Sequence, residues 1–224
     1  MKKTIKPIAV IKTGFKEKFG IPRQSGRAPS SIGEIVFLDK FNDEKAVKRI
    51  EEFSHLWLIF GFSKNPDTES LSVRPPRLGG NERVGVFASR SPFRPNGLGL
   101  SVVKLLEVKK VKQISLMVSG ADLLDGTPIY DIKPYLPSAD KIEDAVGGYA
   151  DEVKNYKLTV HFDKDTKSLI PTEILPTIIE CLSDDPRPSY HEDGRIYGMN
   201  YENFNVNFIV NNDILTVTSV EKIN

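Results

Sequence analysis

The first 135 residues alternate short apolar segments with turn-forming residues. The segments are rich in Val, Ile, Leu and Phe, and Gly, Pro, Asn or Asp stands at most of the junctions between them. Strands are expected at Ile5–Thr13, Gly33–Phe37, Leu56–Phe62, Val84–Ser89, Leu98–Val108, Ile114–Gly120 and Thr127–Tyr135. So many short strands with so few helices predict a mainly β domain, a closed barrel or a sandwich, rather than a doubly wound parallel sheet.

Two local patterns refine this prediction. Leu56–Phe62 is apolar throughout, so we expect it to be buried on both faces. After a cap at Asn42 or Asp43, apolar residues recur at helical spacing as far as Phe53 and predict one helix. Neither GxGxxG nor GxxxxGK[ST] follows a strand, which argues against a Rossmann cofactor site and against a P-loop nucleotide hydrolase.

A second, smaller unit is expected after Pro137. Ser138–Val153 is polar and contains two adjacent glycines, as a linker would. The elements expected beyond it are a strand at Tyr156–Phe162, two short helices within Ser168–Ser183 that begin near Pro171 and Pro176, and a hairpin of Phe204–Val210 and Ile214–Val220. We therefore predict two domains, residues 1–150 and a small α+β domain at residues 151–224.

The small numbers of cysteine and histidine restrict the metal sites and disulfides that the chain can form. The lengths of its apolar runs restrict where in the cell it is expected. Cys181 is the single cysteine, so an internal disulfide and a cysteine-built zinc site are excluded, and we expect its thiol to be buried. Three histidines, His55, His161 and His191, make a histidine-rich metal site improbable, and no metal is expected. No apolar run approaches the roughly 18–20 residues of a membrane helix. We expect a cytoplasmic protein with no membrane partner.

The charge is distributed unevenly along the chain. Lys+Arg 31 against Asp+Glu 30 leaves a net charge of +1, which excludes a protein that coats nucleic acid by bulk charge. Residues 1–100 nevertheless carry 18 basic and 10 acidic side chains, a net of +8, and the remaining 13 basic and 20 acidic side chains give residues 101–224 a net of −7. Such asymmetry indicates contact with a polyanion, although lysines that merely solvate the surface fit these counts equally well.

Residues 73–100 form the most unusual stretch of the chain. Its basic residues are all arginine, opposed by Glu82 alone: Arg74, Arg77, Arg83, Arg90 and Arg94. Guanidinium groups are planar, forked donors that suit phosphate, carboxylate or a stacked base. Pro and Gly pairs mark irregular backbone, and loops on a rigid scaffold commonly carry sites. The alternative is a set of surface turns with solvated arginines.

Other candidate groups lie before and after this stretch. Pro22, Arg23 and Gln24 occupy a turn-like segment, in which the amide of Gln24 could read the edge of a base, although an ordinary loop fits as well. His55 lies between the predicted helix and an apolar strand, where its ring could reach a cleft or be structural. His161 is interpreted as structural.

Acidic and aromatic groups recur toward the C-terminus. Asp122, Asp125 and Asp131 surround a glycine turn close to Lys133, where a carboxylate could bind a ribose or an amine, or cap the turn. Residues 184–208 interleave basic and aromatic groups: Arg187, Tyr190, Tyr197, Tyr201 and Phe204. This mix suits stacking on unpaired bases, and aromatic packing inside the small domain explains it equally well.

In this order, the segments resemble the TsaA-like family of tRNA methyltransferases. The resemblance is carried by PRQ at 22–24, FSHLW at 53–57, the arginine stretch at 73–96, DLLDGTPIYDIKPYLP at 122–137, DDPRPSY at 184–190 and ENFNVNF at 202–208. It covers nearly the whole chain. It implies a single sheet closed into a β-barrel, a small C-terminal α+β domain that helps to hold tRNA, and a homodimer with the cofactor near the subunit interface.

The resemblance also implies an activity and a site. Members methylate N6 of threonylcarbamoyl-adenosine beside the anticodon and take the methyl group from S-adenosylmethionine. The cofactor-site residues carried over are Pro22, Arg23, Gln24, His55, Leu56, Arg90, Leu100, Leu123, Leu124, Asp125, Gly126 and Thr127. Two further readings stay open: a non-catalytic RNA-binding barrel, and a barrel methyltransferase with another substrate.

The resemblance names no catalytic base and no set of RNA contacts. A proton acceptor for N6 would contribute about 10²–10⁴-fold, and Asp125 followed by His55 are our candidates for it. The anticodon loop is single-stranded, so its bases can be splayed into a pocket. Candidates for contact with the RNA are Arg74, Arg77, Arg83, Arg94, Arg187 and Tyr190.

Overall fold

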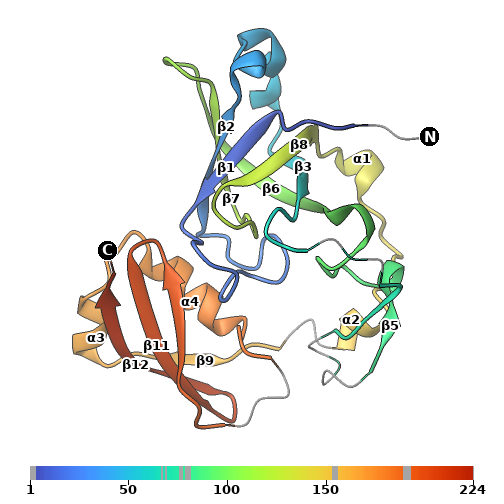
Figure 1. Ribbon diagram of the computed structural model, residues 1–224. Coiled ribbons are helices and arrows are strands. Elements are labelled where there is room, and N and C mark those ends of the chain that lie inside the picture. Colours follow the sequence, from blue (N-terminus) through green and yellow to red (C-terminus); the bar gives the residue numbers. More distant parts are fainter. Residues whose placement is uncertain are drawn as a thin grey trace.

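Six strands close into one barrel in the N-terminal part of the chain (Figure 1). The computed structural model describes residues 4–66, 68, 70–75, 78, 82–152, 156–188 and 193–223. The barrel strands are β1 (Ala9–Thr13), β2 (Ile32–Phe37), β3 (His55–Gly61), β6 (Leu98–Lys109), β7 (Ser115–Ser119) and β8 (Thr127–Pro134). They close in the order β1-β2-β7-β6-β3-β8, and every neighbouring pair is antiparallel. The predicted mainly β fold with a single-sheet barrel is confirmed.

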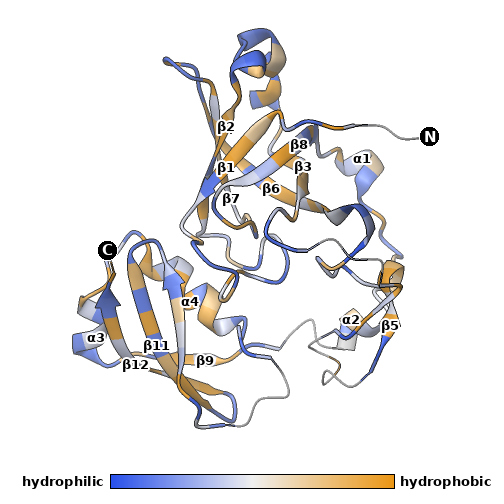
Figure 2. Cartoon of the chain, viewed as in Figure 1, coloured by the Kyte–Doolittle hydropathy of each residue, from blue (hydrophilic) through white to orange (hydrophobic). Residues whose placement is uncertain are grey.

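The alternation of side chains along the strands separates a core from an outer face. Leu56 and Leu58 of β3 are fully buried and pack in the barrel core with Ile11 of β1. Trp57 and Ile59 point to the other face of β3 and are only half-buried. The prediction that this strand is buried on both faces is therefore wrong, because in a barrel only one face of each strand points inward. Apolar colouring follows the barrel strands in Figure 2.

Two connections are less regular than the sequence predicts. The expected helix is instead three short 3-10 turns, η1 (Asp39–Phe41), η2 (Glu44–Val47) and η3 (Ile50–Glu52). Asp43 does cap, since its side chain accepts a hydrogen bond from the Lys45 amide, but Arg49 adopts a φ of 70° and interrupts the helical backbone. The expected strand at Val84–Ser89 ends after two residues.

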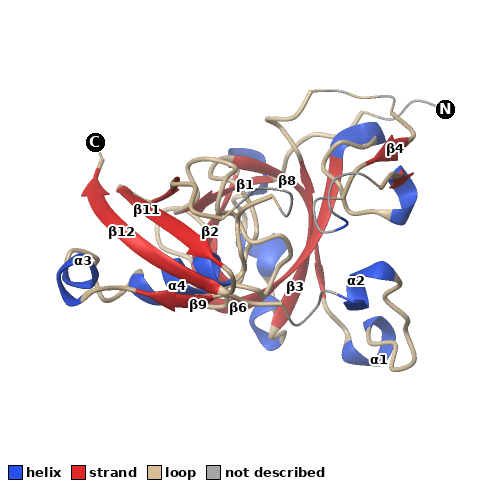
Figure 3. Cartoon of the chain, turned by 90° about the horizontal axis from the view of Figure 1, so that it is seen from below, coloured by secondary structure: helices blue, strands red, loops and turns tan. Residues whose placement is uncertain are grey.

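The described part of this region also contains a small hairpin and two more 3-10 turns. Its elements are β4 (Ser72–Val73), β5 (Val84–Gly85), η5 (Val86–Ala88) and η6 (Pro95–Gly97). The predicted linker contains two single-turn helices, α1 (Pro137–Asp140) and α2 (Tyr149–Glu152). The Tyr149 hydroxyl donates to the Ala88 carbonyl at 3.0 Å, which fastens the linker to η5. Both helices lie on the side of the molecule away from α3 (Figures 1 and 3).

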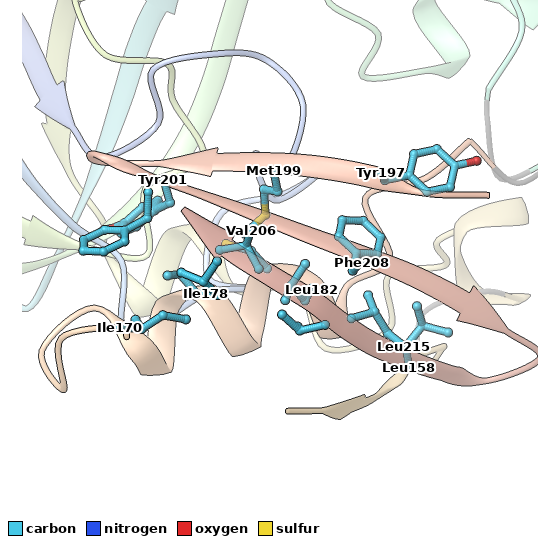
Figure 4. Packing of buried hydrophobic residues seen from close by; sticks show 14 of the residues in the cluster. Leu158, Ile170, Ile178, Leu182, Tyr197, Met199, Tyr201, Val206, Phe208 and Leu215 are labelled. Atoms are coloured by element: carbon cyan, nitrogen blue, oxygen red, sulfur yellow. The ribbon is translucent and has the colours of Figure 1, made fainter. Parts of the chain in front are cut away.

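The C-terminal module is a four-stranded sheet covered by helices. Its elements are β9 (Thr159–His161), α3 (Lys164–Ser168), α4 (Leu175–Ser183), β10 (Tyr197–Tyr201), β11 (Phe204–Asn211) and β12 (Ile214–Lys222). The sheet order is β10-β11-β12-β9, and the predicted hairpin is confirmed as β11–β12. Ile178 and Leu182 of α4 lie against Val206 and Phe208 of the sheet (Figure 4).

Only one of the two helices predicted in this module is where the sequence placed it. A helix does begin beside Pro176, but no helix begins at Pro171. The Pro171 carbonyl instead accepts hydrogen bonds from the Ile174 and Leu175 amides, in a turn that leads into α4. None of the described helices has the length and apolarity to cross a membrane.

The connection between β1 and β2, residues 14–31, completes the core of the C-terminal module. Phe15 and Ala28 are each 1% exposed within that core, and Phe19 and Ile21 pack against it. The Phe15 ring meets Tyr201 edge-on, with centroids 5.1 Å apart. Because a segment of the first half of the chain is part of the second hydrophobic core, the two modules are packed together.

Candidate cofactor site

A cavity of about 700 Å³ opens on the outer face of the barrel. Its walls come from the β1–β2 connection, from Trp57 and Ile59 of β3, from the start of β6, from residues 89–94 and from the turn before β8. Of the predicted cofactor residues it gathers Pro22, Arg23, Gln24, Arg90, Leu100, Leu123, Leu124 and Thr127. A size within the usual range for ligand pockets and a mixture of apolar and polar walls suit a nucleoside-sized ligand.

Close backbone contacts bring these walls together. The Gly26 amide donates to the Gly120 carbonyl at 2.9 Å, and a Cβ on Gly120 would lie 3.3 Å from the Gly26 Cα. Gly120 also has a φ of 77°, which side chains disfavour. At the mouth of the cavity, Nη1 of Arg90 donates to Oε1 of Gln24 at 2.6 Å. This contact joins the PRQ segment to the arginine stretch.

Asp122 brings a largely desolvated carboxyl group to the cavity wall. Desolvation raises the pKa of Asp122, and hydrogen bonding by Ser101, the charge of Arg90 and the Ser25 amide offset this only in part. Its Oδ1 is buried and has no hydrogen-bond partner among the described residues. The sequence drew attention to Asp122 only as one member of an acidic cluster.

Two side chains proposed as proton acceptors lie outside the walls of this cavity. Oδ1 of Asp125 accepts from the Thr13 amide and Oδ2 from Nζ of Lys16, each at 2.9 Å. Burial opposes ionisation, but these hydrogen bonds and the lysine charges outweigh it and lower the pKa of Asp125. Nδ1 of His55 lies 2.9 Å from the Ser54 hydroxyl, and the ring meets Tyr135 edge-on. Neither side chain lines the cavity, and a catalytic role for either stays a prediction.

Two further residues of the cofactor prediction also lie elsewhere. Leu56 is fully buried in the barrel core, on the inward face of β3. Gly126 is exposed, with a φ of 76°, and its amide donates to the Ile11 carbonyl. The outward neighbours Trp57 and Ile59, which sequence reasoning missed, line the cavity instead. Alternation along the strand is the signal that could have found them.

The predicted RNA-contact residues are placed in different settings. Arg94 lines the cavity and donates to the Ser89 carbonyl at 3.0 Å. Arg83 donates to the hydroxyl and the carbonyl of Ser72 at 2.9 and 3.1 Å, within the β4–β5 hairpin. Arg74 is exposed. Arg77 and Tyr190 lie outside the described residues.

Arg187 has a structural setting. It is 8% exposed, and its guanidinium donates to both carboxyl oxygens of Asp185 at 3.0 and 3.1 Å and to Asp193 at 3.3 Å. This burial leaves little of the side chain for a phosphate. The neighbouring aromatic residues Tyr197, Tyr201 and Phe204 pack in the core of the C-terminal module, so packing rather than exposed stacking explains their pattern.

The structure shows the setting of the cysteine and the spacing of possible metal ligands among the residues that it describes. Cys181 is 2% exposed, as predicted, and burial raises the pKa of its thiol. Within the described ranges no three His, Cys, Asp or Glu side chains gather closely enough to hold a metal ion.

Comparison with known proteins identifies the family of the chain. Residues 10–141 match the tRNA-methyltransferase O N-terminal domain and residues 155–223 the TrmO C-terminal domain. The tRNA (adenine(37)-N6)-methyltransferase of Escherichia coli is 40% identical over 225 residues, 96% of each chain. An S-adenosyl-L-methionine-binding protein of Archaeoglobus fulgidus is 39% identical over 143 residues, 64% of this chain and 96% of that one.

Solved structures agree with these sequence matches. A crystal structure of TrmO from Pseudomonas aeruginosa superposes with a TM-score of 0.81 at 35% identity, and the match covers 99% of this chain and 98% of that one. The predicted family and cofactor are thereby confirmed. The chain belongs to the tRNA-methyltransferase O family, the S-adenosylmethionine-dependent enzymes that methylate adenine 37 of tRNA.

Proposed function

We propose that this enzyme methylates N6 of threonylcarbamoyl-adenosine at position 37 of tRNA, and that the cavity beside the PRQ segment holds S-adenosylmethionine. The observation that carries the proposal is the charge of the cavity wall: Lys18, Arg23, Lys64, Arg90 and Arg94 line it. The threonyl group carries a carboxylate and the anticodon loop carries phosphates. Guanidinium and ammonium groups on the cavity wall suit both.

The residues present fit the cofactor. Apolar and aromatic surface for a nucleoside comes from Ile59, Trp57 and Phe62, and one carboxylate, Asp122, would be available to a ligand that carries a sulfonium. When bound, S-adenosylmethionine supplies an electrophilic methyl group. The contribution of the chain is to hold donor and acceptor in line, which can supply roughly 7–11 kcal/mol of the barrier. Asp125 and His55 remain our candidates for removing the N6 proton.

Nucleoside analysis tests the reaction directly. We expect tRNA that contains threonylcarbamoyl-adenosine to yield its N6-methylated form after incubation with enzyme and S-adenosylmethionine, as measured by mass spectrometry of the digested nucleosides. Unmodified tRNA is the control and should give no such product. A methylated nucleoside from the unmodified tRNA, with none from the modified tRNA, would assign another substrate.

An arginine of the exposed hairpin should contribute to the electrostatic part of tRNA binding. Arg74 is exposed at the end of β4, so we propose that it contacts a phosphate. We expect Arg74→Ala to reduce the slope of log affinity against log salt by about 0.7, the contribution of one phosphate on single-stranded RNA. Filter binding over a range of salt concentrations measures it. Arg49→Ala is the matched control, because Arg49 is also exposed but pairs with Glu52 before the start of β3. An unchanged slope for Arg74→Ala would remove this residue from the RNA contacts.

We further propose a homodimer located in the cytoplasm, where tRNA is found. Phe87 and Phe93 are 79% and 47% exposed, in the same segment as the cavity residues Arg90 and Arg94. Leu100, 56% exposed, lies on the cavity wall itself. Exposed apolar groups gathered in one region are typical of protein interfaces. Sedimentation velocity that shows a monomer at micromolar concentration would contradict the dimer.

A further inference from the structure

The positive charge of the cavity walls opposes the binding of a cationic ligand. Its described walls carry five basic side chains and one acidic side chain, Asp122. S-adenosylmethionine carries a positive sulfonium, whereas the product left after methyl transfer, S-adenosylhomocysteine, has a neutral thioether in its place. The basic walls repel the first more than the second. An anionic group inside the cavity is needed if the donor is to be preferred over the product.

Asp122 can provide this negative charge, because it is the one acidic side chain on the described walls of the cavity. Two of the basic groups are held by neutral oxygens, which fixes their position without cancelling their charge: Lys18 donates to the Lys64 carbonyl and the Asn65 amide oxygen within the cavity wall, and Arg23 donates to the Asp185 and Arg187 carbonyls. Arg90 is directed to Gln24 at 2.6 Å. By contrast, Oδ1 of Asp122 has no partner within the described part of the chain.

The burial of Asp122 makes the ionised form of its carboxyl group unfavourable when no cation is nearby. Unsatisfied buried polar atoms are few in native proteins and call for an explanation, of which an absent ligand is one. Desolvation raises the pKa of Asp122, against the opposing effects of Ser101, Arg90 and the Ser25 amide. A cation brought into the cavity would relieve this penalty, and in a water-poor site the attraction between opposite charges is stronger than in bulk water.

We propose that Asp122 is the residue that distinguishes the methyl donor from the spent product, because its carboxylate attracts the sulfonium and has no charge to attract in the thioether. The proposal deepens the cofactor part of the proposed function. It differs from a hydrogen bond to the ribose or the adenine, since those groups are identical in the two ligands. Asp125 cannot take this role in the same way, because Lys16 already pairs with its carboxylate.

Calorimetric titration of the full-length protein tests the proposal. We expect Asp122→Asn to weaken binding of S-adenosylmethionine by about tenfold or more, equivalent to about 1.4 kcal/mol, and to leave S-adenosylhomocysteine almost unaffected. Sinefungin, in which a charged amine replaces the sulfonium centre, should be weakened like the donor. Asp131→Asn is the matched control, since Asp131 is half-exposed beside Lys133 and is not among the cavity residues. Equal weakening of all three ligands, or of none, would overturn the proposal.

A second measurement uses the unaltered protein, in case Asp122→Asn fails to fold. Protonation of Asp122 removes its charge, so the ratio of donor affinity to product affinity should fall as the pH is lowered through its raised pKa. Between about pH 4.5 and 6.5 the amine and the carboxylate of both ligands stay ionised, so their titration does not alter this ratio. A ratio independent of pH would count against Asp122. Loss of the tRNA reaction with an intact affinity ratio would instead reject the proposed substrate and leave this inference standing.

Discussion

Phe15→Ala is expected to lower the free energy of unfolding by about 3–5 kcal/mol, the range found for truncating a buried phenylalanine. The side chain is 1% exposed, meets Tyr201 edge-on and belongs to the core of the C-terminal module although it follows β1. Its loss leaves a cavity at the place where the two modules share a core. Urea denaturation followed by circular dichroism measures the change.

The same substitution should also weaken cofactor binding. The segment anchored by Phe15 continues into Pro22, Arg23 and Gln24 on the cavity wall, so a looser anchor allows these residues more freedom. Val111→Ala is the control, because Val111 is 82% exposed shortly after β6, is not among the cavity residues, and its removal empties no core. Unchanged stability in Phe15→Ala would mean that the β1–β2 connection is not part of the folded core in solution.

Arg27→Ala is expected to destabilise the protein by about 3–5 kcal/mol, because it removes one partner of a largely buried ion pair. Nε of Arg27 pairs with Oδ1 of Asp184, and the two side chains are 20% and 4% exposed. The variant leaves a carboxylate in a site that water barely reaches. Thermal and urea denaturation should both show the loss.

Neutralising Asp184, the partner of Arg27, tests whether the unpaired carboxylate causes this loss of stability. Arg27→Ala combined with Asp184→Asn should recover part of the lost stability, since the buried carboxylate is then neutral. Arg49→Ala, which breaks an exposed pair with Glu52, should leave the unfolding midpoint unchanged. If the double variant were no more stable than Arg27→Ala, the penalty would lie in lost packing of the arginine stem instead.

These two contacts link the C-terminal module to the wall of the proposed cofactor cavity. Phe15 and Arg27 lie on either side of the PRQ segment, and Ser30 adds hydrogen bonds from its amide and hydroxyl to Glu180 of α4 at 2.9 and 2.8 Å. Arg23 of the segment itself donates to carbonyls of the C-terminal module. The C-terminal module therefore holds the PRQ segment, the proposed cofactor loop, in place through these contacts.

Strand positions were predictable where side-chain alternation and turn residues agree. All six barrel strands overlap predicted ones, because short apolar runs between Gly, Pro and Asn leave few other options. The 42–53 region failed because helical spacing of its apolar residues says nothing about the positive φ at Arg49. Val84–Ser89 failed because β propensity cannot supply a partner strand beyond Gly85.

In the candidate site, too, the sequence predicts some features and only the folded chain shows the others. Gln24 and Arg90 could be selected from their segments, but only the folded chain brings them to 2.6 Å. Asp122 and Asp125 are equivalent in sequence, three residues apart in one turn. Lys16 and the Thr13 amide pair with Asp125, whereas Asp122 faces the cavity. Which carboxylate is neutralised depends on residues more than 100 positions away.

By itself, the sequence determined the family, the β-rich fold, the segments that build the cavity and the uneven distribution of charge, because each of these depends on local pattern or on order along the chain. Only the tertiary structure decided that Arg187 is buried, that Trp57 faces the cavity and that Phe15 belongs to the second core. Burial and pairing are set by contacts between distant segments. A local sequence pattern therefore does not show which of its polar side chains will pair with a distant residue in the folded chain.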